Sequence, residues 1–278
     1  MTLKYLKLHI KSMLSHPSIL GWGVGGTIIW AALGAFIFSA EFLKTLEGSS
    51  IGYYVSALYY TAGWFGCLSL YSFSTLATGL MFNIFYSTAS VVYASKFTKL
   101  TPVKYYIYNV LSSLLIFLVL SLFTLASVYG FYSYSFKVNL YPRNIMLILV
   151  FSLIAGLFLY LLSMLLTLLP IVLGHPKAVT TIAYAPMIFA MVFSYAQLYL
   201  YFTGIEEIIC LSPFNNIISL LAYGYTGMNI PITFTSPEEG FINIYTCLTS
   251  LICWLVALSV INIYIIKKMK AVSPYEFF

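Results

Sequence analysis

The sequence contains no aspartate, and its seven acidic residues are all glutamate. Charged side chains make up only 7% of the 278 residues, whereas 62% are hydrophobic. A soluble protein needs far more polar side chains to cover its surface. The composition therefore excludes a soluble globular domain and indicates an integral membrane protein. The absence of aspartate also excludes aspartate-dependent prenyl-transfer chemistry.

Motifs of catalytic, nucleotide and metal sites are missing as well. No glycine begins a GxxxxGK[ST] phosphate-binding loop, and no GxSxG nucleophile elbow lies inside a predicted membrane span. The four cysteines show no CxxC or Cys/His spacing of a zinc site. We expect them to pack as small apolar residues; they are Cys67, Cys210, Cys247 and Cys253. The sequence thus predicts neither an enzyme nor a metalloprotein.

Glu206 and Glu207 share two acids with the EExxxR core of intramembrane metalloproteases, but the arginine and a paired histidine are missing. The helix dipole favours acidic side chains near a helix start. We therefore interpret this pair as a solvated cap on the outer side. His175 precedes a proline, which is typical of a turn residue rather than of a proton carrier.

Long uncharged runs dominate the sequence. A bilayer core of about 30 Å needs about 20 apolar residues in a helix. Two runs leave alternatives, because 48–95 could hold two spans and 208–237 could cross the membrane or only dip into it. We predict six spans, near residues 19–40, 53–80, 106–130, 145–170, 179–202 and 241–266. The whole of 1–278 then forms a single transmembrane domain.

The positions of the basic residues decide between these alternatives, because short cytoplasmic loops gather lysine and arginine. Six spans place ten lysines inside, namely Lys4, Lys7, Lys11, Lys96, Lys99, Lys104, Lys177, Lys267, Lys268 and Lys270. The outer side holds Lys44, Lys137, Arg143, Glu41, Glu47, Glu206, Glu207, Glu238 and Glu239. Eight spans would place three of these lysines outside, and seven spans would place one basic terminus outside. We expect a multi-pass protein of the plasma membrane with both termini in the cytoplasm, and its net charge of +6 indicates topology rather than nucleic-acid binding.

The N-terminal residues 1–17 place lysines on one helical stripe and apolar residues on its neighbour, before His16-Pro17 breaks the helix. This pattern predicts an amphipathic helix on the cytoplasmic membrane surface, or else a basic flank that only sets topology. Gly21 and Gly25 follow with a GxxxG spacing. They predict a close helix contact, either within the chain or with another subunit. Pro186 is expected to kink the fifth span.

A basic break interrupts the first half of the chain at KFTKLTPVKYYIYNV, residues 96–110. The cytoplasmic segment 81–104 is too long for a simple turn and too apolar for a solvated loop, so we expect it to bury against another protein. Pro102 cannot continue a helix from Lys99. We therefore predict a short helix, a turn and then the start of the third span.

These features resemble the permease subunits of ABC transporters of the type-2 exporter class. The stretch KLTPVKYYIYNVLSSLL is similar to the turn of that family's cytoplasmic coupling segment, with Leu100, Pro102 and Tyr106 in the family's places. The stretch LSPFNNIISLLAYGYTG, residues 211–227, is similar to the family's membrane-dipping external element. One departure is that STASVVYASKF has neither the Arg-Glu pair nor the glycine that often precede the coupling turn.

The resemblance implies an all-α membrane protein with six spans and an N-terminal interfacial helix. It also implies a coupling helix between spans two and three and an external element over 203–240. The partners would be separate ATPase subunits, which bind ATP and Mg, and a second copy of this permease or a homologous one, in the lipid bilayer. The implied coupling residues are Val91, Val92, Lys96, Phe97, Lys99, Pro102 and Lys104, and the implied residues of the external element are Glu206, Glu207, Pro213, Asn215 and Asn216.

The core of each predicted span is free of charged residues, and ion-coupled transport normally needs such residues. This pattern favours ATP-driven movement of an amphiphilic or apolar substrate. Two alternatives stay open, a secondary or passive transporter that acts alone and a membrane scaffold without transport activity. An ATPase subunit that co-purifies would separate them.

Overall fold

The computed structural model describes residue 11 and residues 19–45, 52–97, 102–199, 209–234 and 240–268. Within these residues, six helical segments are long and apolar enough to cross a membrane. They are Leu20–Leu43, Tyr53–Tyr86, Ile107–Phe136, Ile145–Val172, Ala178–Leu198 and Ile244–Ile266. The helical class and the number of six agree with the prediction from the sequence. Apart from Lys11, the predicted interfacial helix lies outside the described residues.

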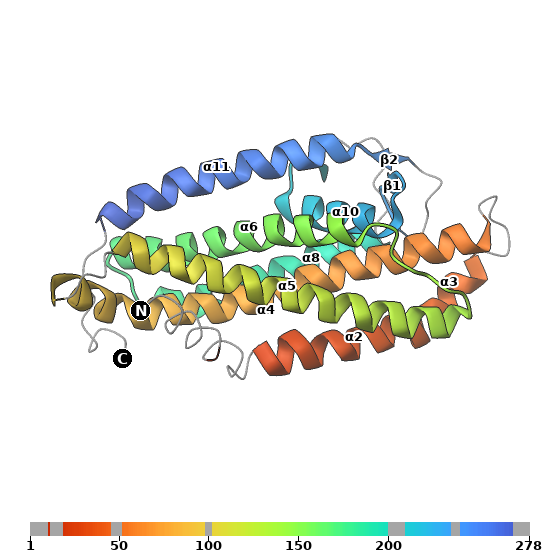
Figure 1. Cartoon of the computed structure of the whole chain (residues 1–278), viewed down its shortest axis with the longest axis horizontal. Coiled ribbons are helices and arrows are strands. Elements are labelled where there is room, and N and C mark those ends of the chain that lie inside the picture. The colour runs from red at the N-terminus through yellow and green to blue at the C-terminus, as the bar shows by residue number, and fades with distance from the viewer. Residues whose placement is uncertain are drawn as a thin grey trace.

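The helices run side by side along the long axis of the molecule (Figure 1). The first span is one continuous helix made of η1 (Ile19–Gly26), α2 (Thr27–Leu33), η2 (Gly34–Phe38) and α3 (Ser39–Thr45). The other helices are α4 (Tyr53–Phe97), α5 (Pro102–Phe136), α6 (Ile145–Val172), α7 (Ala178–Ile182), α8 (Ala185–Tyr199), α10 (Pro213–Thr226) and α11 (Ile244–Lys268). The short strands β1 (Ile230–Pro231) and β2 (Phe241–Ile242) pair antiparallel, with Ile230 opposite Ile242.

The segments η1 and η2 have the wider turns of a π-helix. In each segment, one backbone carbonyl oxygen accepts hydrogen bonds from two side-chain hydroxyl groups. The carbonyl oxygen of Gly23 accepts from Thr27 Oγ1 at 2.5 Å and from Ser72 Oγ at 3.1 Å. The carbonyl oxygen of Ala35 accepts from Ser39 Oγ at 2.5 Å and also from Ser135 Oγ. Side chains inserted into the helical hydrogen-bond ladder account for the local widening of the helix.

Helix α4 lies at the centre of the bundle. Within its most apolar stretch, 94% of the residues are buried, compared with 17–44% in the other five candidate spans. It packs against the first span, α5, α6, α8 and α10. Two glycines make this packing close, because a Cβ on Gly63 would lie 2.4 Å from the Phe234 ring and one on Gly66 would lie 2.7 Å from the Ile218 carbonyl oxygen.

The fifth span is broken, as Pro186 predicts. Helix α7 ends at Ile182 and α8 begins at Ala185. A proline has no N–H for the carbonyl one turn earlier, and its ring crowds that turn. At the break, Thr78 Oγ1 of α4 donates to the carbonyl oxygen of Ala183 at 2.9 Å. The interruption is therefore satisfied by the central helix rather than by lipid.

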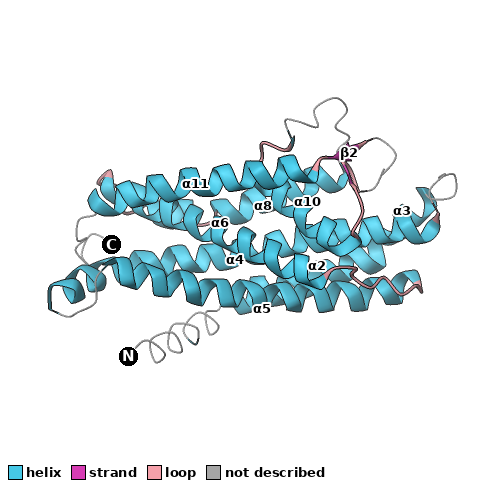
Figure 2. Cartoon of the chain, turned by 45° about the horizontal axis from the view of Figure 1, so that its top comes forward, coloured by secondary structure: helices cyan, strands magenta, loops and turns pink. Residues whose placement is uncertain are grey.

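The prediction of a separate short helix after the second span is wrong. Helix α4 continues without interruption to Phe97, because residues 81–97 contain neither glycine nor proline. Helix α5 then begins at Pro102, at the first helical position, where the missing N–H of proline costs nothing. The end of α4 reaches beyond the neighbouring ends of α6 and α11 in both views (Figures 1 and 2). Residues 81–97 of the predicted coupling segment are thus an extension of α4.

Candidate functional site

A cavity of about 580 Å³ lies between the first span, α4 and α8. Its volume falls in the range of small-molecule sites in proteins. Eleven residues line it, namely Trp30, Phe38, Glu41, Trp64, Cys67, Leu68, Tyr71, Met191, Ser194, Tyr195 and Leu198. Most of these side chains are aromatic or aliphatic, so the wall suits the apolar part of a ligand.

Helical spacing explains why these residues face one another. Helix α4 contributes Trp64 and Tyr71, seven residues apart, with Leu68 between them on the same face. Helix α8 contributes a matching stripe that begins at Met191 and ends at Leu198. The two stripes belong to helices that pack directly on each other. The cavity is therefore a product of regular helix faces rather than of loops.

The cavity extends from one end of the membrane region to its middle. Glu41 lies two residues before the end of the span Leu20–Leu43 and is exposed, whereas Tyr71 lies near the centre of the span Tyr53–Tyr86. Glu41 is the only charged residue among those that line the cavity. An amphiphile could thus keep a polar or cationic group at the rim and its apolar part inside.

Three residues of the wall carry buried polar atoms without a hydrogen-bond partner. Within the described part of the chain, Trp64 Nε1, Tyr71 OH and Ser194 Oγ are buried and have no hydrogen-bond partner. Unpaired polar atoms at membrane depth are costly. These atoms are covered by the packing around them, so the exposed wall of the cavity is mainly aromatic and aliphatic.

The predicted external element is built around α10, which is shorter than any candidate span. Its start lies at half depth, because Trp254 Nε1, near the middle of the span Ile244–Ile266, donates to the Leu211 carbonyl oxygen at 3.0 Å. In the first turn, Phe214 stacks on Phe193 of α8 with ring centroids 5.2 Å apart. It also meets Phe158, in the middle of α6, edge to face at 5.9 Å.

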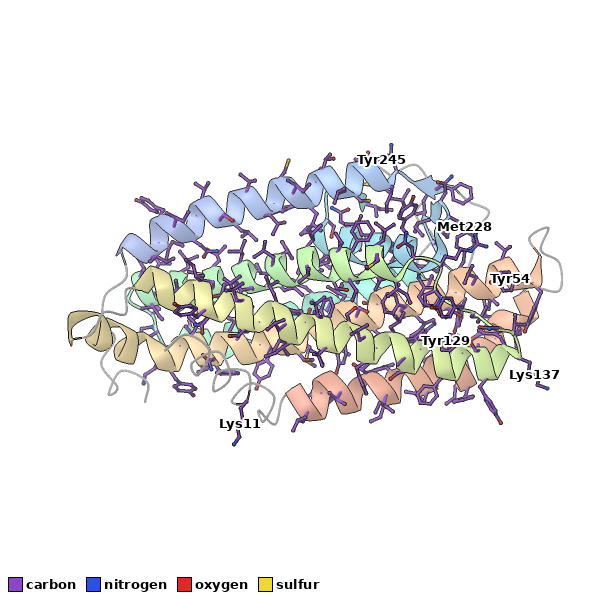
Figure 3. The ribbon with its side chains drawn as sticks, viewed as in Figure 1. Lys11, Tyr54, Tyr129, Lys137, Met228 and Tyr245 are labelled. Carbon is purple, nitrogen blue, oxygen red and sulfur yellow. The ribbon has the colours of Figure 1, made fainter. Side chains whose placement is uncertain are left out.

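The other end of α10 lies at the end of the bundle, beside the connection between α5 and α6. The backbone N–H groups of Arg143 and Asn144 donate to the carbonyl oxygens of Tyr225 and Gly224 at 2.9 and 3.2 Å. Figure 3 shows Met228, just beyond α10, at the same end as Tyr54, Tyr129 and Lys137, far from Lys11. Helix α10, with 14 residues, is half as long as α6, which has 28.

Local sequence signals define both ends of α10. The Ser212 side chain caps the start by accepting from the Asn215 N–H at 3.5 Å, and Pro213 occupies the first turn. The Nδ2 of Asn216 donates to the Cys210 carbonyl oxygen at 2.9 Å. Gly227 ends the helix with φ of 64°, a conformation that favours glycine. The structure thus brings Pro213, Asn215 and Asn216 together at half depth, whereas Glu206 and Glu207 lie outside the described residues.

The predicted coupling residues gather at the opposite end of the bundle. Val91, Val92, Lys96 and Phe97 lie in the last turns of α4, and Pro102 and Lys104 lie in the first turn of α5. Lys99 lies outside the described residues. Their role in coupling stays a prediction.

The close contact predicted for Gly21 and Gly25 is not made within the described part of the chain, and the alternative, a contact with another subunit, stays a prediction. Within the described residues, a Cβ on Gly21 would meet nothing, and one on Gly25 would meet only the backbone of Leu20. The first span instead approaches its neighbours at Gly26 and Gly34, where a Cβ would lie 3.0 Å from the Tyr71 hydroxyl and 2.9 Å from the Trp64 ring. The contact is shifted because the stripe of η1 that carries Gly26 faces α4.

Sequence reasoning missed the cavity and a pair of close cysteines. The aromatic spacing of Trp64 and Tyr71 was a usable signal for a special face of α4. No sequence signal joined Cys210 to Cys247, whose sulfur atoms lie 3.3 Å apart. In the described part of the chain, no group of three or more histidine, cysteine or acidic residues could hold a metal ion.

Comparison of the chain with protein-family models, with curated protein sequences and with solved structures finds no match. The grounds for a function are therefore the sequence motifs and the geometry described above.

Proposed function

We propose that this chain is the transmembrane permease subunit of an ATP-driven ABC exporter of the type-2 class. It would move an amphiphilic or apolar substrate across or out of the plasma membrane. The observation that carries the proposal is the half-length helix α10, which follows the fifth candidate span and starts at half depth. The sequence resemblance implies a membrane-dipping element at this place.

The energy would come from separate ATPase subunits, which bind ATP and Mg. Nucleotide-driven closure of these subunits would act on the extended end of α4 and the start of α5. Helix α4 also carries Trp64 and Tyr71 in the cavity wall. At 1.5 Å per residue, Val91 and Tyr71 are about 30 Å apart along one continuous helix. A rigid central helix can therefore transmit a push at its end to the cavity by shifting helix packing.

The cavity is the proposed substrate site. Glu41 is the only charged residue within the six candidate spans, and it lies at the rim. Transport driven by protons or ions normally depends on charged residues deeper in the membrane. The wall instead offers aromatic and aliphatic surface. In this proposal, the end with α10 and Glu41 faces outside and both termini are cytoplasmic.

The test is to purify the tagged chain from its native membranes in mild detergent. We expect an ATPase subunit with a GxxxxGK[ST] loop to co-purify and to hydrolyse ATP, because this chain has no such loop of its own. The separated chain should bind no ATP at micromolar concentration.

Transport without any ATPase subunit would favour the stand-alone transporter instead. A chain that neither transports nor retains an ATPase would favour the membrane scaffold. The matched control is the same complex with the phosphate-binding lysine of the partner replaced, which should assemble but not transport.

A further inference from the structure

Two thiols that are far apart in the sequence meet at the start of α10. Cys210 lies in the turn before α10, and Cys247 is the fourth residue of α11. Their sulfur atoms are 3.3 Å apart, and both side chains are buried, with 3% and 1% of their surface exposed. A small apolar core of Ile209, Ile232 and Ile242 surrounds them, separate from the main core.

Several contacts fix this proximity from both sides. The Trp254 indole N–H donates a hydrogen bond to the carbonyl oxygen of Leu211, the residue directly after Cys210. The Asn216 side-chain amide donates a hydrogen bond to the carbonyl oxygen of Cys210 itself. On the other side, Cys247 lies in the first turn of α11, where its N–H donates to the Asn243 carbonyl at 3.2 Å. The two sulfur atoms are thus positioned by helices and by anchored backbone.

We propose that Cys210 and Cys247 form a disulfide that fastens the start of α10 to α11. A disulfide has a sulfur–sulfur distance of about 2.0 Å, so the sulfur atoms must approach by about 1.3 Å. Rotation of the two side chains can supply this movement. The bond would hold the turn before α10, and with it Phe214, beside the first turn of α11, because neither could withdraw from α11.

The reaction is a thiol–disulfide exchange with an external disulfide, such as that of an extracytoplasmic oxidoreductase. The two thiols lose two protons and two electrons and form one S–S bond, while the external disulfide is reduced to two thiols. Because both side chains are buried in the folded chain, the exchange takes place during insertion, before the element packs. The inference rests on the proposed orientation, in which this end faces the oxidising outer side.

The other two cysteines serve as internal controls. Cys67 lies in the cavity wall, where its thiol donates to the Ser194 carbonyl oxygen at 3.7 Å. Cys253 is exposed on α11, six residues after Cys247. Six residues place it about 9 Å along the helix and on another face. We expect both to stay reduced.

The experiment counts alkylated cysteines by intact mass. The full chain is isolated from its native membranes in the presence of a maleimide, denatured, and alkylated with or without prior reduction. We expect two maleimides on the unreduced chain and four on the reduced chain, with a peptide map that joins Cys210 to Cys247. Four maleimides on the unreduced chain would overturn the proposal.

Two variants make the assignment specific. Unreduced Cys210→Ser should take up three maleimides, because the bond is lost and Cys247 becomes reactive. Unreduced Cys67→Ser should take up one, because the bond remains and only Cys253 reacts. The same number in both variants would overturn the assignment to this pair.

A separate labelling experiment distinguishes this inference from the proposed function. Asn229→Cys and His175→Cys place exposed thiols at opposite ends of the bundle. Four maleimides on the wild type, together with Asn229→Cys labelled from outside, would overturn the disulfide and leave the orientation intact. Labelling of Asn229→Cys only after permeabilisation, together with four maleimides on the wild type, would overturn both the orientation and the disulfide.

Discussion

The hydroxyl of Tyr225 donates a hydrogen bond of 2.6 Å to the carbonyl oxygen of Leu140. Both residues are fully buried, with 0% of their surface exposed. The bond joins the end of α10 to the connection between α5 and α6, beside the backbone hydrogen bonds of Arg143 and Asn144. Helix α10 is therefore fixed at the end of the bundle by contacts that are independent of those at its start.

The first prediction concerns this bond. Tyr225→Phe should lower the free energy of unfolding by about 1–3 kcal/mol, because the Leu140 carbonyl is left buried without its partner. The measurement is denaturant unfolding of the purified chain in detergent. Tyr245→Phe is the matched control, because the Tyr245 side chain is 76% exposed and should not matter. Equal stability of wild type and Tyr225→Phe would contradict a structural role for this bond.

The same residue predicts a pH dependence. Burial raises the pKa of Tyr225 above its usual value near 10, and the nearby Tyr129 and Tyr54 add to this rise. Below pH 10 the phenol is protonated in both folded and unfolded chains, so its contribution to stability is constant. As the pH rises above 10, the unfolded chain loses this proton first, and stability should fall. Unfolding measured from pH 8 to 11 should show a smaller decrease in Tyr225→Phe than in the wild type.

A pair of glycines tests the central position of α4. A Cβ on Gly66 would lie 2.7 Å from the Ile218 carbonyl oxygen of α10, so Gly66→Ala should cost about 1–3 kcal/mol of unfolding free energy. Gly130 in α5 has open space around it, and Gly130→Ala should leave stability unchanged or raise it by up to about 1 kcal/mol. The measurement is thermal unfolding of both variants and of the wild type. An equal effect of the two changes would speak against close packing of α10 on α4.

Filling the cavity should block the substrate path without dissociating the transporter. Met191 lines the cavity and Val192 does not, so Met191→Trp adds volume at the cavity wall, whereas Val192→Trp adds the same side chain at a position outside it that is 57% exposed. We expect Met191→Trp to lower transport at least about tenfold, equivalent to about 1.4 kcal/mol. Val192→Trp should leave transport near the wild-type rate. Transport of a fluorescent amphiphile from loaded vesicles is the measurement, and equal rates in both variants would exclude this cavity from the path.

The coupling hypothesis is tested at the end of α4. An aromatic residue in the centre of an interface typically contributes about 2 kcal/mol, so Phe97→Ala should weaken ATPase association about 30-fold or uncouple hydrolysis from transport. Lys99→Glu should weaken association in a salt-dependent way. Tyr245→Ala and Lys137→Glu, at the opposite end of the bundle, are the matched controls.

The two readouts are a pull-down at several salt concentrations and a transport assay. If Phe97→Ala leaves both ATPase association and transport unchanged, the coupling hypothesis is wrong, and the lysines near residue 99 only set topology.

Several local features could be predicted from the sequence because their causes are local. The six apolar helices follow from run length and composition, and the break in the fifth span follows from Pro186. The start of α10 follows from Ser212 and Pro213, because serine is favoured as a helix cap and proline in the first turn. The continuation of α4 to Phe97 has a local cause as well, because residues 81–97 contain neither glycine nor proline.

The sequence by itself determined that this chain is a helical membrane protein, because composition and run length decide whether a segment can leave water. Only the tertiary structure decided that α4 is central, that Trp64 and Tyr71 face Met191 across a cavity, and that Cys210 meets Cys247. The physical reason is that lipid is as apolar as a protein core. Hydrophobic periodicity therefore cannot separate a face that meets lipid from one that meets another helix, and small residues and hydroxyl groups decide that choice only once the helices are packed.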